Sequence, residues 1–214
     1  MASYTTRQRD PLLDSNMQAA IEKRGKELIG IGLVILGIMV AMMLGSYSPD
    51  DPNFMSATDA PVQNWLGRMG ASIAGALLMM IGWAAWGLAL VLVAWGVRFV
   101  MHRLPERPLG RVIFAPIAVA VLAIYCSTLS AGPEWEQRYG FGGLGGLFGD
   151  TVLQIILTIL PMPVTWGVKV MSLVSGVGFL GLGAYVLGFT WREMKALGRY
   201  LLIGLILAYS MLLR

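Results

Sequence analysis

Glycine patterns are the first candidates for chemistry in this chain, because the spacing G-x-G-x-x-G can hold the phosphates of a dinucleotide. The spacing occurs twice, over residues 140–145 and 176–181. Neither copy follows a predicted strand within a βαβ unit, which is the setting that this function requires. The one Gly-Lys pair, at residues 25–26, continues with Glu27 and therefore does not form a Walker A loop. The sequence thus predicts no nucleotide site and no ATP-driven motor in this chain.

Side chains for acid–base, nucleophilic or metal chemistry are also isolated. Glu134 and Glu136 lie in a loop with no pattern that indicates a pocket, so we interpret them as solvated charges. His102 is the only histidine and has no cysteine near it to complete a metal site. Cys126 is the only cysteine and lies in an apolar run, where a small buried hydrophobe is expected. We predict no catalytic residue, no cofactor and no bound metal.

The composition places the chain in a membrane. Hydrophobic residues make up 57% of it and charged residues 13%, against roughly 25% charged in soluble domains. Four long runs without charged residues can each cross the ~30 Å hydrocarbon core as a helix. They are residues 28–47, 69–97, 112–131 and 170–189. The predicted fold class is an all-α integral membrane protein, with four transmembrane helices in one domain, residues 28–191.

Basic residues indicate the orientation. They gather in residues 1–27, 98–111 and 192–214, whereas residues 48–68 and 132–150 contain one each. Because cytoplasmic loops carry an excess of Lys and Arg, both termini are expected in the cytoplasm and the two poorly basic loops outside. The predicted inner-face charges are Arg98, Arg103, Arg107, Arg111, Arg192, Lys195 and Arg199.

Two further apolar segments are predicted not to cross. Residues 151–160 are too short for a spanning helix and end at a proline, so a re-entrant or interfacial helix on the outer side is expected. Residues 192–214 place Arg192, Lys195 and Arg199 on one face of a helix, opposite a Leu-rich face. Such an amphipathic helix suits the inner membrane interface, and we expect it to lie there.

Small residues recur at every fourth position in two places, a spacing that favours close packing of membrane helices. One stripe lies in the first span, and the other lies at the start of residues 69–97, which we predict as one continuous helix. The six residues are Gly37, Ala41, Gly45, Gly67, Ala71 and Gly75. We expect these six residues at helix–helix contacts. If the two stripes faced each other, both would lie at such a contact.

The loop after the first span begins with Ser-Tyr-Ser-Pro-Asp-Asp-Pro at residues 46–52. Two prolines together with Asp and Asn side chains predict a rigid turn instead of a flexible loop. We expect this turn to contact partner proteins outside the membrane. The residues predicted for that contact are Pro49, Asp50, Asp51, Pro52 and Phe54.

Three motifs resemble one protein family. They are Ser-aromatic-x-Pro-x-Asp-Pro at residues 46–52, Asn-x-x-Gly-x-x-Gly-Ala-x-x-Ala at 64–74 and Gly-Gly-x-x-Gly at 142–146. In this order they resemble the amino-terminal membrane domain of the bacterial FtsK/SpoIIIE septal DNA translocases, over most of the chain. Phe54 stands where many relatives have Trp, and it keeps an aromatic side chain at that position.

The resemblance implies a membrane anchor that localises a DNA translocase to the division septum and supports assembly of the division machinery. It implies a location in the bacterial inner membrane, contacts with the bilayer and with other division-site membrane proteins, and a homo-oligomer that is hexameric with the motor. The linker and the ATP-driven motor are expected beyond residue 214. This fragment itself is expected to be no enzyme and to bind neither DNA nor ATP directly.

Two other classes of function stay open from the residues. A small transporter or channel subunit would need ionisable residues within its spans, and the four predicted spans contain none, with only Lys169 next to one. An intramembrane enzyme would need a nucleophile, an acid or a metal at membrane depth, where the chain offers Cys126 and scattered Ser and Thr. Ion flux or catalytic turnover by the purified chain would distinguish either class from an anchor.

Overall fold

The computed structural model describes residues 14–54, 58–103, 108–133, 135, 139 and 142–212. These residues form helices and turns, with no strand among them. The helices are α1 (Ser15–Gly45), α2 (Gly67–Ile81), the 3-10 helix η1 (Gly82–Ala84), α3 (Ala85–Val100), α4 (Pro108–Ser127), α6 (Gly146–Ile159), α7 (Val164–Leu187) and α8 (Trp191–Leu212). Within the described part, five helical segments are long and apolar enough to cross a bilayer. The prediction of an all-α membrane protein is confirmed.

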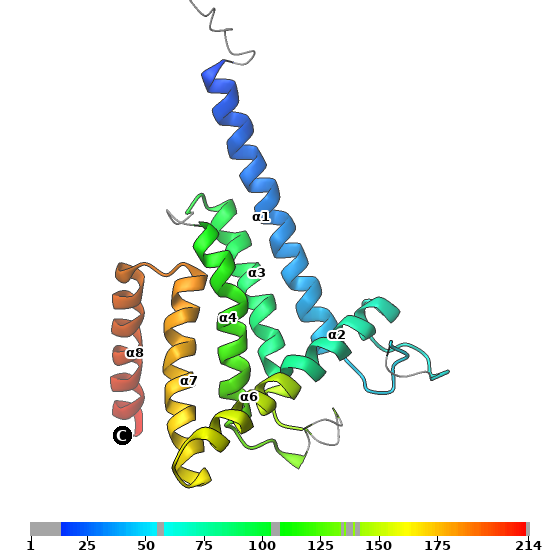
Figure 1. The fold of residues 1–214 in the computed structure, drawn as a ribbon. Helices are drawn as coiled ribbons and strands as arrows, with labels where there is room; N and C mark the ends of the chain where they lie inside the picture. The colour runs from blue at the N-terminus through cyan, green and yellow to red at the C-terminus, as the bar shows by residue number, and fades with distance from the viewer. Residues whose placement is uncertain are drawn as a thin grey trace, which may run out of the picture.

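The helices form a bundle with two distinct ends (Figure 1). α3, α4 and α7 run side by side, α1 leans against α3, and α2 and α6 lie across one end. We call the end at which α3 leads toward α4 the basic end, because Arg98, Arg103 and Arg111 lie there. The opposite end, with α2, α6 and residues 46–66, is the loop end.

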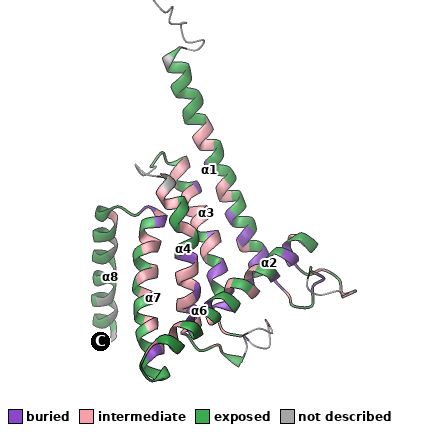
Figure 2. Ribbon diagram, in the orientation of Figure 1, coloured by how far each residue is buried: buried purple, intermediate pink, exposed green. Residues whose placement is uncertain are grey.

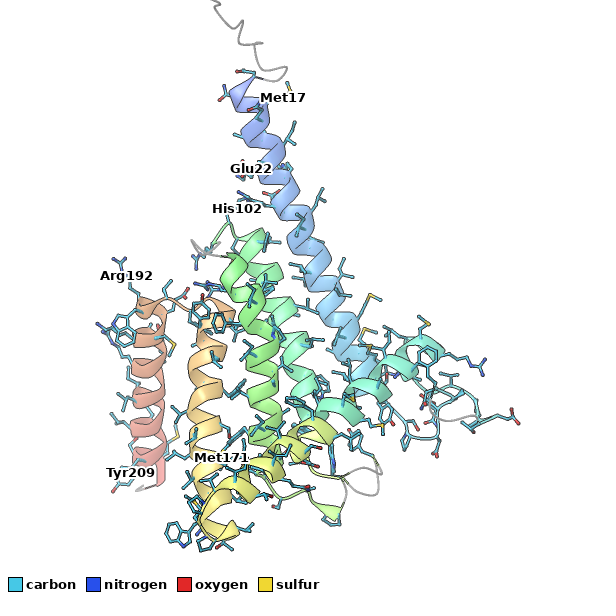
Figure 3. All side chains as sticks on the ribbon, viewed as in Figure 1. Met17, Glu22, His102, Met171, Arg192 and Tyr209 are labelled. Atoms are coloured by element: carbon cyan, nitrogen blue, oxygen red, sulfur yellow. The ribbon has the colours of Figure 1, made fainter. Side chains whose placement is uncertain are left out.

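α1 begins well before the predicted span and projects past the basic end. Figure 3 shows Met17 and Glu22 on the projecting part, beyond His102 of the bundle. Ion pairs one helical turn apart support this part, with Lys26 Nζ 2.6 Å from Glu22 Oε1. Residues 15–27 of the polar segment and the first apolar run therefore form one helix.

The predicted continuous helix over residues 69–97 is wrong, because the chain bends at Gly82. Gly82 has φ 57° and ψ −136°, a conformation open to glycine and costly for other residues. The Trp83 N–H donates to the carbonyl oxygen of Leu144 at 2.8 Å, which fixes the bend against the segment before α6. α3 thus runs along the bundle axis, while α2 lies across the loop end (Figure 1).

α1 packs on α3 through glycines. A Cβ on Gly30 would lie 2.7 Å from the Gly96 carbonyl oxygen, and a Cβ on Gly96 would lie 2.6 Å from that of Gly30. Lower on the same helices, a Cβ on Gly37 would lie 2.7 Å from Val93 Cγ2. The two backbones therefore touch at these positions, and only a residue without a side chain fits. Figure 2 shows that buried residues of α1 gather in its lower half.

α4 packs against α7 and α6. A Cβ on Gly176 of α7 would lie 3.1 Å from the Tyr125 ring of α4, so part of the second G-x-G-x-x-G pattern is a helix contact. Gly149 of α6 faces the Ala123 carbonyl oxygen of α4 in the same way. α6 begins five residues before the apolar segment 151–160 predicted for it and ends at Ile159.

After the turn at residues 188–190, α8 runs in the direction opposite to α7 (Figure 1), whereas the sequence predicted a helix along the membrane surface. None of the described residues in its most apolar window is buried. The first turn of α8 is stabilised by a capping box between Thr190 and Glu193. The Glu193 N–H donates to Thr190 Oγ1 at 3.3 Å, and Glu193 Oε2 accepts from the Thr190 N–H at 2.8 Å. The anchoring of α8 is therefore at the basic end.

Candidate functional site

A buried carboxylate holds the described part of the return segment, residues 46–54 and 58–66. Asp51 has no exposed surface. Its Oδ1 accepts from the Gln63 N–H at 2.7 Å and its Oδ2 from the Asn64 N–H at 3.0 Å. Asn64 in turn donates from Nδ2 to the Met43 carbonyl oxygen at the end of α1, at 2.8 Å. One carboxylate and one amide thus join α1, the turn and the approach to α2.

This arrangement corrects two of the predicted partner contacts. Asp51 and Pro52 are buried, because Asp51 satisfies backbone N–H groups 12 and 13 residues further along the chain. The Asp51 side chain is not open to a partner, and Pro52 is accessible only as part of the lining of a recess. Pro49, Asp50 and Phe54 are exposed, and Phe54 is 82% exposed.

An exposed apolar surface accompanies the return segment at the loop end. Besides Phe54, Trp65 is 71% exposed and Met69 is 66% exposed. A recess of about 660 Å³ lies between the turn and the start of α2. Its lining residues are Pro52, Asn53, Phe54, Thr58, Asp59, Arg68, Met69 and Ser72. The recess and the exposed rings together form a surface to which another protein could bind.

The glycines of residues 142–149 serve the junction between α2, α3 and α6, not a phosphate. Gly146 has φ 65°, and a Cβ on it would lie 2.6 Å from the backbone nitrogen of Gly82. The Gly143 N–H donates to Asp150 Oδ2 at 2.6 Å, which closes the turn before α6. The sequence signal for this role was the glycine run itself, which the resemblance also singled out.

Replacing Gly146 with alanine is expected to destabilise the folded chain by about 2 kcal/mol or more, since an unfavourable φ and a steric clash with backbone add together. Thermal unfolding of the purified chain in detergent measures this change. Gly132→Ala is the matched control, because a Cβ at Gly132 would meet nothing within 4 Å. Equal unfolding temperatures of the two variants would contradict the junction described here.

A chain of aromatic rings packs beside the same junction. Tyr47 stacks on Tyr139, with ring centroids 5.8 Å apart, and Tyr139 lies 4.1 Å from the Trp135 ring. Trp135 then contacts Trp83 at 6.3 Å. The contacts link the end of α1 to η1 through residues of the loop before α6, and such pairs add stability beyond burial alone.

The basic end carries the other polar cluster. Arg98 pairs with Glu193, with Arg98 Nη2 3.3 Å from Glu193 Oε2, and its guanidinium lies 5.6 Å from the Phe189 ring centroid. Arg111 lies 5.3 Å from the Tyr185 ring centroid. The structure therefore brings together Arg98 and Arg111 of the predicted inner-face charges. The others among the described residues, Arg103, Arg192, Lys195 and Arg199, are exposed, and Arg107 lies outside the described residues.

The small-residue stripe of α1 meets α3 and not the stripe of α2. A Cβ on Gly37 would lie 3.1 Å from the Ala89 carbonyl oxygen, and a Cβ on Gly45 would lie 3.5 Å from the Trp86 ring. Ala41 lies between them, partly buried beside the core that α1, α2 and α3 share. The expected arrangement of two facing stripes is therefore not the one in the structure.

The stripe of α2 divides into residues with different roles. Ala71 and Gly75 are buried in α2, as expected of residues at a helix contact. Gly67 has φ 66°, and its Cβ position meets nothing within 4 Å. Glycine there provides the backbone conformation at the start of α2 and does not form a close helix contact. Because the chain bends at Gly82, α2 crosses the loop end (Figure 1), where its residues Ala74 and Leu78 share a core with Met43 and Leu44 of α1.

Among the described residues, no group of three or more His, Cys, Asp or Glu side chains could hold a metal ion. Cys126 is a buried free thiol. Instead, polar side chains of the described residues stabilise the return segment at one end of the bundle and, separately, the basic end at the other. These two places are the candidate functional sites of the chain.

Comparison with known proteins gives a consistent result. Residues 22–196 match the family model described as the 4TM region of DNA translocase FtsK/SpoIIIE. A DNA translocase FtsK from Azospirillum brasilense is 33% identical over 153 residues, which cover 70% of this chain and 24% of the relative. One from Caulobacter vibrioides is 28% identical over 132 residues, covering 60% of this chain and 16% of the relative. One from Brucella suis is 32% identical over 128 residues, covering 60% and 15%.

The chain thus spans about a quarter or less of the curated relatives that it matches. No solved structure matches it. The matched region is the membrane domain of these translocases, and no match to their motor domain is found in this chain. By a family match over most of its length, the chain belongs to the 4TM membrane-domain family of the FtsK/SpoIIIE DNA translocases.

Proposed function

We propose that this chain is the membrane anchor of a DNA translocase, which it localises to the division septum and helps to assemble with other division proteins. The family match carries the proposal. The two ends of the bundle support it, since one end presents basic residues and the other a rigid, aromatic return segment. In this proposal the motor lies on the basic side, the full-length protein is a hexamer, and this fragment binds neither DNA nor ATP directly.

The return segment is the proposed surface for division-site partners. Its buried Asp51 and Asn64 hold it in one shape, so the exposed Phe54 and Trp65 need little ordering on binding. Large exposed aromatic side chains are the residues that most often dominate protein interfaces. A transporter or channel is not favoured, because the described spans have no buried Asp, Glu, Lys, Arg or His along their length.

A fluorescent fusion of this chain is expected to concentrate at midcell in dividing bacteria. Replacing Phe54 and Trp65 together with alanine should reduce midcell enrichment severalfold and leave membrane insertion intact, because it removes the aromatic anchors and no span. Trp166→Ala is the matched control, since Trp166 is 63% exposed at the start of α7. Uniform membrane fluorescence of the unaltered fusion would contradict the localising role, whereas the anchor role would stand.

We also propose that both termini lie in the cytoplasm and that α8 is not one of the four spans. The family description counts four transmembrane segments, and the match ends at residue 196, within the first turns of α8. The segments that contain α1, α3, α4 and α7 then make four crossings. In the structure α8 runs back along the direction of the bundle, so this proposal requires α8 to turn onto the cytoplasmic surface in the membrane, which the basic residues at its start favour.

Reporter fusions after residue 214 test this orientation. A reporter that fluoresces only in the cytoplasm should be bright, and a phosphatase active only outside the membrane should be silent, because four crossings return the chain to its starting side. Fusions after residue 60 of the return segment should give the reverse pair. A silent fluorescent reporter after residue 214 with an active phosphatase would make α8 a fifth span.

A further inference from the structure

Arg98 and Arg111 converge beside Gly188, at the end of α7. Both guanidinium groups lie against the position that a Cβ on Gly188 would occupy, Arg111 through Nη1 and Arg98 through Nε. Gly188 is buried and has φ 81°, so the turn between α7 and α8 leaves this space to the two arginines. Two like charges this close repel each other in a partly dry setting unless an anion lies beside them.

Among the described acidic side chains, one pairs with Arg98 and none pairs with Arg111. Arg98 meets Glu193, whose Oε2 is shared with the Thr190 N–H. Arg111 Nε and Nη1 are buried and have no hydrogen-bond partner. The Tyr185 ring attracts the cation through its face but offers no acceptor in the plane of those N–H groups. Buried donors of a charged group without an acceptor are strongly unfavourable, so the site lacks an anionic oxygen.

We propose that Arg98 and Arg111 bind the phosphate of a phospholipid headgroup. Arg98 follows the uncharged part of α3 and Arg111 precedes that of α4, which places both at the boundary of the apolar region. Guanidinium forks match two phosphate oxygens at once. The Tyr185 and Phe189 rings below them, each about 40% exposed, provide apolar surface for the lipid beside its phosphate. Arg192 and Lys195 at the same end favour an anionic lipid over a zwitterionic one.

Native mass spectrometry of the full chain in detergent tests the site, with phosphatidylglycerol as the probe and phosphatidylcholine as the comparison. Arg111→Gln is expected to weaken phosphatidylglycerol binding about tenfold, because charge-assisted hydrogen bonds to the phosphate are lost. Arg103→Gln removes an exposed charge from the same end and should change binding by about twofold or less. If Arg111→Gln fails to fold, Arg111→Lys retains the charge without the fork and should show a partial loss.

Glu193→Gln is expected to change the affinity for phosphatidylglycerol in the opposite direction. It removes the acid that competes for Arg98, while glutamine keeps the capping box with Thr190, so phosphatidylglycerol should bind severalfold tighter. A purely structural role of the arginines would not produce this gain. Unchanged binding by Arg111→Gln, or weaker binding by Glu193→Gln, would overturn the proposal. Displacement of the lipid by millimolar inorganic phosphate or by short duplex DNA would assign the site to another phosphate and overturn the lipid assignment.

Discussion

Replacing Gly96 with leucine is expected to destabilise the folded chain by about 3 kcal/mol or more, at or beyond the upper end of overpacking costs in cores. The reason is that α1 and α3 touch through their backbones here. A Cβ on Gly96 would lie 2.6 Å from the Gly30 carbonyl oxygen and 2.7 Å from the Val34 backbone nitrogen. Neither atom can move without shifting the whole of α1. Folded yield on size exclusion and the thermal unfolding midpoint in detergent measure the effect.

Gly32→Leu is the matched control for this prediction. Gly32 lies on the same helix as Gly30, is exposed, and its Cβ position meets nothing within 4 Å. Leucine there adds helix propensity and faces lipid, so folded yield should be unchanged or higher. If Gly96→Leu folds as well as Gly32→Leu, α1 and α3 do not meet along this seam.

The second large effect is expected from Asp51→Ala. The change leaves the N–H groups of Gln63 and Asn64 without their acceptors in a buried place. Two hydrogen bonds to a charged group at ~1.5–3 kcal/mol each predict a loss of about 3 kcal/mol or more in the free energy of unfolding. Thermal unfolding measures it, and limited proteolysis between residues 46 and 66 reports whether the return segment has opened.

Asp50→Ala is the comparison for Asp51→Ala. Asp50 is the adjacent carboxylate and is exposed, so its removal should change stability by about 0.5 kcal/mol or less. Similar protection from protease in both variants would show that the Asp51 carboxylate does not hold the return segment. Greater sensitivity of Asp50→Ala would reverse the assignment of the two acids.

Hydropathy predicted the helices of the bundle because apolar runs long enough to span a membrane have few other structures open to them. α1, α4 and α7 each cover most of a predicted span, with ends that differ by a few residues or, for α1, by a polar extension. The bend at Gly82 gave no such signal, since both sides of it are equally apolar. It depends on Leu144, which accepts a hydrogen bond from Trp83 across 61 positions of sequence.

The sequence identified residues that belong to the candidate sites, but it did not predict which residues contact one another there. The rigid turn at residues 46–52 was expected from its prolines, yet Asp51 was predicted to be a surface acid because its partners lie 12 and 13 residues away. The small-residue spacing marked Gly37 as a packing residue, while Gly30 and Gly96 were missed because they form no stripe with it. The pairing of Arg98 with Glu193 required the turn after α7, which no local pattern specifies.

The bend at Gly82 also sets how this protein fits a bilayer. As one helix, residues 69–97 would reach about 43 Å, so the surrounding lipid would have to thicken or the helix to tilt strongly. With the bend, η1 and α3 together extend about 30 Å, close to the thickness of the hydrocarbon core. The bend thereby removes the hydrophobic mismatch of this segment, which fits a bilayer of ordinary thickness. For this segment, membrane thickness gives no reason for enrichment at a division site, which leaves protein contacts and headgroup chemistry to provide one.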